Sequence, residues 1–239
     1  MERATKELIS NLKKQKQQKS LLFLDNVKII KDALPKINAK LILSTFETLP
    51  FDAGDVKVYR TDDRTINMLA DTVTPQGVLC VAEFKRQELS PTMGNFLVLD
   101  ALQDPGNAGT LIRTSVACGF SAVFLVDSVH ITNAKLVRSS VGAVFNQNVF
   151  EMSKEEFIEF AVSNKLPLAK CDMNGENVFK KVFENPIGVV VGNEGQGVSE
   201  EISKLCKISL SIPMKGNIES LNAGVSGSII MYQIAKNSF

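Results

Sequence analysis

The chain has 239 residues, 44% of them hydrophobic and 22% charged, with a net charge of +1, so it can bury an ordinary core without disulfides. Four widely separated cysteines and a single histidine, His130, argue against a disulfide framework, a zinc knuckle, a histidine metal site and a Ser-His-Asp triad. No stretch approaches the roughly 20 apolar residues that span a bilayer. Because the charged, Gln-rich N-terminus is not a secretory signal either, we expect a cytoplasmic protein with no metal and no membrane partner.

The first part of the chain, residues 1–84, reads as a small α/β domain. A polar helix is predicted over residues 3–19, and an apolar stretch at 21–24 precedes a second helix that Pro35 ends. Asp62 is placed to cap a third helix. Short apolar runs predict strands at 41–43, 56–59 and 78–81.

The N-terminal end of the chain is basic. Among residues 1–20, the only acidic residues are Glu2 and Glu7, against Arg3, Lys6, Lys13, Lys14, Lys16 and Lys19. Such a basic end could contact RNA phosphates. Charge alone favours the alternative, which is a solvated helix face.

A polar stretch, residues 85–95, holds Pro91 and Gly94 and reads as a linker to a second domain over residues 96–239. Four runs of the second domain are apolar on both faces, which is typical of parallel strands covered by helices on both sides. These strands are predicted at 96–99, 122–126, 187–191 and 208–212, and helices at 107–118, 153–163, 199–204 and 221–236. Since ligands of such sheets bind beyond the carboxyl ends of the strands, the loops that follow the strands are the candidate site.

The first of these loops, residues 100–113, reads DALQDPGNAGTLIR. Asp104 and Pro105 suit the start of a helix, where Asn107 offers a polar side chain. Arg113 then lies in an otherwise apolar helical segment. An arginine there indicates either an anionic ligand or an ion pair with an acidic neighbour, and the local sequence does not choose between them.

The second loop, residues 192–197, reads GNEGQG. Three glycines and one carboxylate in six residues indicate unusual backbone angles or a ligand close to the main chain. The glycine spacing is not that of a dinucleotide fingerprint, and no Gly-Lys-Ser/Thr follows as in a phosphate-binding P-loop. A tight strand-to-helix turn without a ligand is the alternative.

The third loop, residues 212–223, reads IPMKGNIESLNA and leads into the last helix. Pro213 ends a strand and Gly216 permits a turn. Ser220 and Asn222 stand at the helix start, where capping could explain either one. Capping does not explain why a short polar pair meets a Gly-rich loop at the same edge of the sheet.

Together the three loops resemble the SpoU/TrmH family of SPOUT methyltransferases, over about residues 95–237. The first loop matches the family's Asn-to-Arg motif, the second its Gly-Asn-Glu-Gly motif, and the third its Ile-Pro-Met…Ser-Leu-Asn motif. One such motif is weak, but three in order are specific. Residues 74–83, TPQGVLCVAE, are similar to the family's N-terminal domain, although Asp25 and Asn26 replace the Glu-Gly that is common there.

The resemblance implies a parallel-sheet SPOUT methyltransferase domain with a C-terminal trefoil knot, preceded by a small α/β substrate-binding domain similar to certain ribosomal proteins. It also implies a homodimer whose interface lies beside the cofactor pocket. The implied cofactor is S-adenosyl-L-methionine, and the implied methyl acceptor is a ribose 2′-hydroxyl of RNA, with ribosomal RNA favoured over tRNA. The residues that the resemblance assigns to the cofactor are Gly192, Asn193, Gly195, Ile212, Met214 and Leu221. Those that it assigns to catalysis are Arg113, Asn107, Glu194, Ser220 and Asn222.

Family similarity assigns Arg113 to deprotonating or orienting the hydroxyl. Because the pKa of a free guanidinium lies above about 12, we favour phosphate binding and stabilisation of the forming alkoxide over a base role.

Other functions stay open at this point. A non-catalytic RNA-binding or ribosome-assembly protein on the same fold would be expected to lack Asn107, Arg113 or Glu194, and all three are present. A dehydrogenase or nucleotide enzyme would need a phosphate fingerprint that the sequence lacks. A member of the family acting on tRNA, or on another ribose or base position, is the third alternative.

Overall fold

The computed structural model describes residues 1–239 except 86–87, 91–93, 185, 217 and 219, and the described chain forms two compact units. The N-terminal unit comprises Met1–Arg86 with Thr132–Arg138, and the C-terminal unit comprises Gln87–Ile131 with Ser139–Phe239. Parts of the predicted linker over 85–95, including Pro91, lie outside the described residues. No helix among the described residues is long and apolar enough to cross a membrane.

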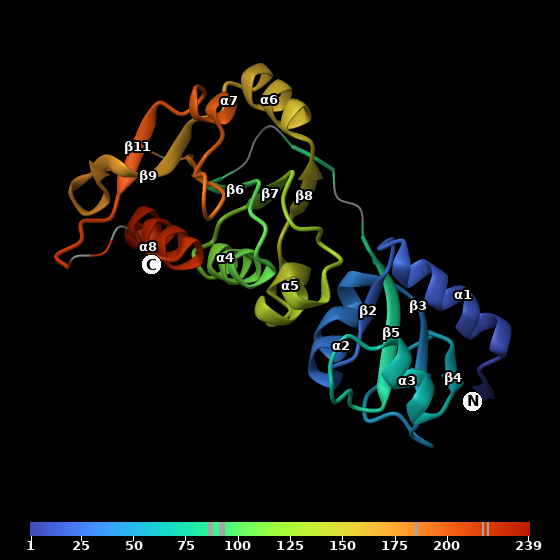
Figure 1. The fold of residues 1–239 in the computed structure, drawn as a ribbon. Helices are drawn as coiled ribbons and strands as arrows, with labels where there is room; N and C mark the ends of the chain where they lie inside the picture. The colour runs from blue at the N-terminus through green and yellow to red at the C-terminus, as the bar shows by residue number, and fades with distance from the viewer. Residues whose placement is uncertain (86–87, 91–93, 185, 217, 219) are drawn as a thin grey trace. The chain divides into compact units, whose positions relative to one another are not determined.

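The N-terminal unit is a five-stranded mixed sheet with helices on it, in the strand order β1-β4-β3-β5-β2 (Figure 1). Its strands are β1 (Glu2–Arg3), β2 (Leu22–Leu24), β3 (Ile37–Ser44), β4 (Val58–Arg60) and β5 (Val78–Phe84). Its helices are α1 (Lys6–Gln17), α2 (Val27–Ala33), which continues into a 3₁₀ turn at Leu34–Lys36, and α3 (Asp63–Leu69). Pro35 ends α2 as predicted, and the side chain of Asp62 caps α3 by accepting the N–H of Thr65.

The C-terminal unit is built on six parallel strands in the order β11-β9-β10-β6-β7-β8. The strands are β6 (Phe96–Asp100), β7 (Ala122–Val126), β8 (Val149–Met152), β9 (Leu168–Asn177), β10 (Gly188–Val191) and β11 (Ile208–Ser211). The helices of this unit are α4 (Pro105–Ala117), α6 (Lys154–Ser163), α7 (Glu200–Ser203) and α8 (Ala223–Ala235), with 3₁₀ turns at Ala143–Asn146, Val178–Lys180 and Lys236–Ser238. α5 (Ala134–Ser139) falls almost entirely in the segment that groups with the N-terminal unit.

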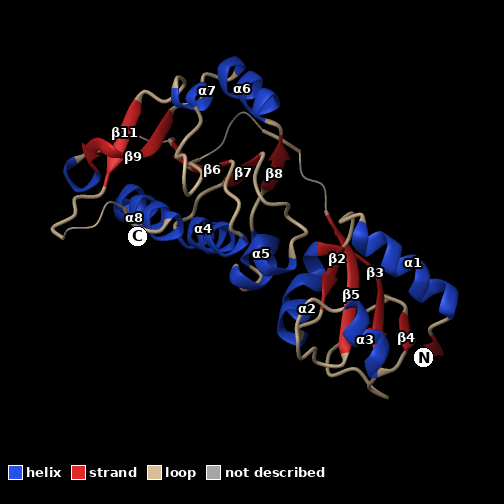
Figure 2. Cartoon of the chain, viewed as in Figure 1, coloured by secondary structure: helices blue, strands red, loops and turns tan. Residues whose placement is uncertain are grey.

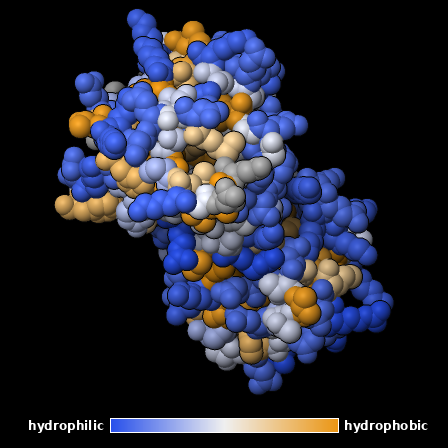
Figure 3. Space-filling view, turned by 60° about the vertical axis from the view of Figure 1, so that its left-hand side comes forward, coloured by the Kyte–Doolittle hydropathy of each residue, from blue (hydrophilic) through white to orange (hydrophobic). Residues whose placement is uncertain are grey.

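Helices cover both faces of this parallel sheet, as the continuous apolar strands predict (Figure 2). On one face, Phe124 of β7 packs against Phe157 of α6 with ring centroids 5.5 Å apart, and Ile202 of α7 joins the same cluster. On the other face, α8 lies against α4 and β10. Close approach there depends on Gly227, because a Cβ at this position would lie 2.5 Å from Leu111 Cδ2 and 2.9 Å from Val191 Cγ2. The surface shown in Figure 3 is mostly hydrophilic, with apolar residues in separate groups.

α5, β8 and β9 were not predicted, because α5 is only six residues long and the two strands are not continuously apolar. None of the residues of β8, VFEM, is fully buried. β9 pairs with β10 only over its first three residues, and its last residues pair with β11 alone, where none of them is buried. Gly175 permits this extension, since a Cβ there would lie 2.5 Å from the main-chain carbon of Ser209.

The predicted helix over 107–118 begins two residues earlier than expected. Asp104 caps α4 by accepting the N–H groups of Gly106 and Asn107, and Pro105 occupies the first helical position, where its missing N–H costs nothing. Asn107 therefore lies in the first turn of α4. Arg113 lies more than two turns into the helix.

Candidate active site

The three loops predicted from the sequence meet at the carboxyl edge of the parallel sheet. Glu194, in the loop after β10, accepts hydrogen bonds from Asn107 Nδ2 at 3.0 Å and from the main-chain N–H of Asp104 at 3.1 Å. Asn222, in front of α8, donates from its Nδ2 to Asn107 Oδ1 at 2.9 Å. Residues from three separate loops thus form one hydrogen-bonded chain, which we call the Glu194–Asn107–Asn222 network.

The direction of each bond in this network is fixed. Asn222 Oδ1 caps α8 by accepting the N–H of Val225 at 3.2 Å, so the Nδ2 of Asn222 must face Asn107. Asn107 can then accept only through Oδ1, which turns its Nδ2 toward the carboxylate of Glu194. Glu194 is needed only as an acceptor in this arrangement, which is the role of an ionised carboxylate. The capping expected for Asn222 is present, and the rest of its amide is used by the network.

Glu194 is held in its ionised form. Partial burial is the largest single influence and raises its pKa, but hydrogen bonds from Asn107 and from main-chain N–H groups, including those of Asp104 and Gln103, together outweigh it. The pKa of Glu194 therefore lies below its ordinary value of 4.5. The network carries a negative charge at neutral pH.

The loop after β10 folds back on itself. Asn193 and Gly197 exchange two main-chain hydrogen bonds of 2.9 Å, and Asn193 Oδ1 accepts the N–H groups of Gly195 and Gln196. Gly197 has a φ of +73°, and a Cβ on Gly192 would lie 2.2 Å from the main-chain carbon of Gly197. These two glycines are required by the loop itself.

Gly195 departs from the expectation that each glycine meets a special backbone constraint. Its φ is not in the left-handed region, and its Cβ would come no closer than 3.7 Å to Asn193 Oδ1. The space beside Gly195 is therefore open, and only a bound ligand would give the position a need for glycine.

We expect these two glycines to respond differently to substitution. Gly192→Ala forces the main chain at Gly197 and Val198 to move, which should cost about 1–3 kcal/mol of strain. We therefore expect it to lower both the melting temperature of the ligand-free protein and the affinity for the cofactor. Gly195→Val should leave the melting temperature of the ligand-free protein unchanged and lower only the affinity for the cofactor. Thermal unfolding and calorimetric titration with S-adenosylmethionine measure both effects. If both substitutions lower the melting temperature of the ligand-free protein equally, the different roles assigned to Gly192 and Gly195 are wrong.

Apart from the side chain of Asn222, the third loop contributes main chain to the site. The main-chain groups of Ile212, Met214 and Leu221 make no hydrogen bond with any residue that the structure describes. Ser220 is exposed and likewise has no hydrogen-bond partner within the described part of the chain. These groups are free to bind a ligand at the edge where the network lies.

Arg113 is not brought into contact with the network. It lies on the exposed side of α4, six residues after Asn107, which is about 9 Å along the helix and about 120° around it. No ion pair of Arg113 with an acidic neighbour, the alternative left open by the sequence, occurs among the described residues. The premise that an arginine is out of place in an apolar helix is wrong, because α4 buries only one side.

Three further residues support the site and were not singled out from the sequence. The Gln103 side-chain amide donates to the carbonyls of Ala101 at 3.2 Å and Asp127 at 3.1 Å, and both of those residues have positive φ. Asn193 Nδ2 also donates to the Ala101 carbonyl, at 2.9 Å. The only sequence signal was their place directly after the ends of β6 and β7.

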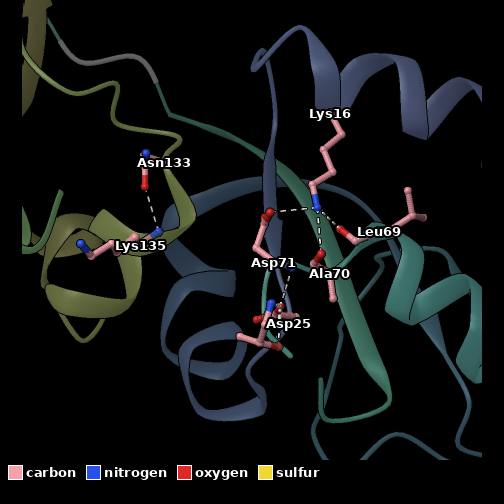
Figure 4. Close-up of polar contacts among 8 residues, drawn as sticks. Lys16, Asp25, Leu69, Ala70, Asp71, Asn133 and Lys135 are labelled. Carbon is pink, nitrogen blue, oxygen red and sulfur yellow. Dashed lines mark hydrogen bonds and ion pairs between the residues drawn. The ribbon is translucent and has the colours of Figure 1, made fainter. Parts of the chain in front are cut away.

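The basic N-terminal helix is partly structural. Lys16 Nζ donates to the carbonyls of Leu69 at 2.6 Å and Ala70 at 2.9 Å, at the C-terminus of α3, and pairs with Asp71 at 2.9 Å (Figure 4). Asp25 is buried and fixes the next part of this loop by accepting the N–H groups of Asp71 and Thr72. Lys16 therefore ties α1 to the end of α3, whereas Lys14 is exposed.

This difference predicts opposite effects for two neighbouring lysines. Lys16→Ala should destabilise the N-terminal unit by about 1–3 kcal/mol, because partly buried carbonyls and a carboxylate lose a charged donor. Lys14→Ala should leave stability unchanged and reduce only salt-dependent RNA affinity. Hydrogen exchange over residues 63–72 and RNA titrations at two salt concentrations measure these effects. Equal protection of this segment in both variants would refute the structural role of Lys16.

Comparison with known proteins places this arrangement among known sequences and folds. Residues 94–232 match the model of the SpoU rRNA Methylase family. The chain is 26% identical over 227 residues to the 23S rRNA (guanosine(2553)-2′-O)-methyltransferase RlmP of Bacillus subtilis, covering 93% of this chain and 91% of that protein.

Two solved structures share the fold over nearly the whole chain. The AdoMet-bound rRNA methyltransferase from Sinorhizobium meliloti superposes with a TM-score of 0.86 at 22% identity, covering 100% of this chain and 98% of that one. The SpoU methyltransferase AviRb from Streptomyces viridochromogenes, in complex with AdoMet, gives a TM-score of 0.86 at 20% identity and covers 98% of both chains. Both units of this chain therefore have counterparts in known folds.

Proposed function

The chain belongs to the SpoU rRNA methylase family, and from this membership we propose that it transfers the methyl group of S-adenosyl-L-methionine to a ribose 2′-hydroxyl of ribosomal RNA. The observation that carries the proposal is the Glu194–Asn107–Asn222 network, which joins all three family motifs at the carboxyl edge of the sheet. The relative RlmP acts on 23S rRNA, which favours ribosomal RNA over tRNA.

The residues present fit the proposed cofactor. Main-chain groups of Ile212, Met214 and Leu221 have no hydrogen-bond partner in the described part of the chain and could bind the adenosine moiety. The open space beside Gly195, next to Gly192 and Asn193, could admit the rest of the molecule. When bound, S-adenosylmethionine supplies an electrophilic methyl group, and the chain must then align the hydroxyl and accommodate its proton.

The protein side chains divide the remaining work. The network fixes the start of α4 and α8 and so determines where a ribose can lie, with Ser220 free to bind it. We assign Arg113 to binding a phosphate, for which its planar guanidinium is suited. Arg113 lies apart from the network within one chain. A bound nucleotide would bridge the two, with its ribose at the network and its phosphate at the extended side chain of Arg113.

Three features of the wider molecule belong to the same proposal. The C-terminal region would form a trefoil knot, a view supported by the path from β10 outward past β9 to β11 and back to α8 on α4. The N-terminal unit would be a ribosomal-protein-like RNA-binding domain, supported by its basic α1. A ribosomal RNA substrate would place the protein in the cytoplasm.

We also propose a homodimer that uses the exposed side of α8. A shallow groove there is lined by Phe179, Ser228, Ile229, Tyr232 and Gln233. Phe179 and Tyr232 remain about half exposed although both are large and apolar. Exposed apolar patches of this kind are typical of protein interfaces. The groove lies on the helix that Asn222 caps, so the interface would adjoin the active site.

The dimer predicts a specific effect of charge on α8. Tyr232→Glu should shift the protein toward a monomer, because a buried unpaired carboxylate opposes association. Val162→Glu on α6 is the matched control, since Val162 is also exposed but lies on the opposite face of the sheet. Light scattering after size-exclusion chromatography measures the mass. A wild-type monomer, or a Tyr232→Glu dimer as stable as the control, would remove this interface.

Mass-spectrometric mapping of ribose methylation tests the proposed function. Ribosomal RNA and tRNA from cells with and without the protein should differ at one ribose, in the ribosomal RNA. A difference confined to tRNA would reassign the substrate, and no difference in either RNA, together with no binding of S-adenosylmethionine, would favour a non-catalytic RNA-binding protein.

A further inference from the structure

Asp100 is a buried carboxylate at the carboxyl end of β6. It is only 1% exposed, in a strand whose other four residues are apolar. Burying a carboxylate is costly unless a hydrogen-bond donor compensates. The donor is the main-chain N–H of Ser199, 2.6 Å from Asp100 Oδ2 and 99 positions away in the sequence.

Ser199 is where the Gly-rich loop ends and α7 begins. Its side chain does not cap the helix, and its Oγ is buried without a hydrogen-bond partner among the described residues. The hydrogen bond to Asp100 therefore holds this end of the loop without help from the serine hydroxyl.

The beginning of the same loop is attached to Ala101, the residue that follows Asp100. Asn193 Nδ2 donates to the carbonyl of Ala101 at 2.9 Å, and Ala101 adopts a φ of +53°, which is unusual for a residue with a Cβ. Asp100 and Ala101 thus fix the two ends of the segment 193–199. Between these two attachments lie Glu194 and the open space at Gly195.

We infer that Asp100 is a positioning residue that sets the shape of the Gly-rich loop and thereby the affinity for S-adenosylmethionine, an inference that rests on the proposed function. Asp100 itself need not touch the cofactor. Loss of its carboxylate would leave the Ser199 N–H without an acceptor and release the loop at one end. Because a hydrogen bond to a charged group is lost, we expect Asp100→Ala to lower the affinity for S-adenosylmethionine about tenfold to a hundredfold.

The experiment compares four full-length proteins: wild type, Asp100→Ala, Asp100→Asn and Asp25→Ala. Asparagine keeps an acceptor oxygen of the same shape and should restore most of the affinity. Asp25 is the matched control, because it is also a buried carboxylate that accepts main-chain N–H groups, those of Asp71 and Thr72, but lies in the N-terminal unit.

Two measurements separate positioning from a general loss of stability. Calorimetric titration with S-adenosylmethionine should show weakened binding in Asp100→Ala and near-normal binding in the other two variants. Steady-state methylation should show a raised KM for the cofactor in Asp100→Ala, with the KM for RNA and kcat at saturating cofactor unchanged. Hydrogen exchange of the ligand-free proteins should show faster exchange over residues 193–203 in Asp100→Ala alone.

The outcomes distinguish this inference from the proposed function. If wild type binds no S-adenosylmethionine, the proposed function fails, and hydrogen exchange still decides whether Asp100 holds the loop. If wild type binds and Asp100→Ala binds equally well, or loses kcat and RNA affinity in the same proportion as cofactor affinity, Asp100 is not a positioning residue for the loop. If Asp100→Ala does not fold, an Asp100→Asn protein with the KM of wild type supports the inference, and one weakened as much for RNA as for the cofactor overturns it.

Discussion

Arg113→Ala is expected to fold, to bind S-adenosylmethionine normally, and to lose about 10²–10³ in the rate of methyl transfer, the typical cost of removing one transition-state partner. The structure strengthens the first half of this expectation. Arg113 is exposed, has no ion pair among the described residues, and lies in a helix where alanine is the better helix former. The melting temperature should therefore be unchanged or slightly raised.

Single-turnover methylation, with the melting temperature measured on the same preparation, tests this prediction. Arg113→Lys should restore little activity, because an ammonium group cannot make the planar two-pronged contact of a guanidinium with a phosphate. Thr110→Ala is a suitable control, since Thr110 is exposed on the same side of α4 one turn earlier. A folded Arg113→Ala protein that methylates RNA within a few-fold of wild type would remove Arg113 from the catalytic residues.

The parallel sheet and the position of the site were predictable because both follow from local patterns in the sequence. Strands buried on both faces are continuously apolar, so β6, β7, β10 and β11 were found to within one residue at either end. Their carboxyl ends must share one edge, and the polar and Gly-rich loops that follow them therefore had to meet. The convergence of Glu194, Asn107 and Asn222 follows from this rule.

What the sequence could not reveal depends on contacts between distant residues. The half-polar strand β9 is stabilised by pairing with β11 beyond the rest of the sheet, and its own pattern does not show this. The main-chain N–H of Ser199, which donates to the buried carboxylate of Asp100, lies 99 positions away in the sequence. The exposure of Arg113 depends on which side of α4 packs on the sheet, and a start two residues earlier than predicted changes its place in the helix.

The second large effect is expected for Asn107→Asp, which replaces the amide nitrogen by an oxygen and places a second carboxylate beside Glu194. Asn107 Nδ2 now donates to Glu194 at 3.0 Å, and an aspartate there can donate nothing while ionised. Two carboxylates at this distance cannot both be ionised without cost, so the pair should either hold one proton or move apart. A displacement of about 1 Å at a site that aligns reactants can cost about 10²-fold in rate, which is the loss expected at neutral pH.

The pH dependence identifies the cause of that loss. In the wild type the pKa of Glu194 is depressed, so the network's contribution to stability is present above the ordinary value of 4.5 and is lost as the pH falls through the lower folded-state pKa. In Asn107→Asp the apparent pKa of the pair should be raised, and activity relative to wild type should recover as the pH falls from about 8 to about 6. Asn107→Ala is the control: it removes both hydrogen bonds without adding a charge, so its loss should not change with pH over this range. If Asn107→Asp and Asn107→Ala show the same pH profile, the ionised state of Glu194 does not govern the site, and the network is a structural connection between the loops.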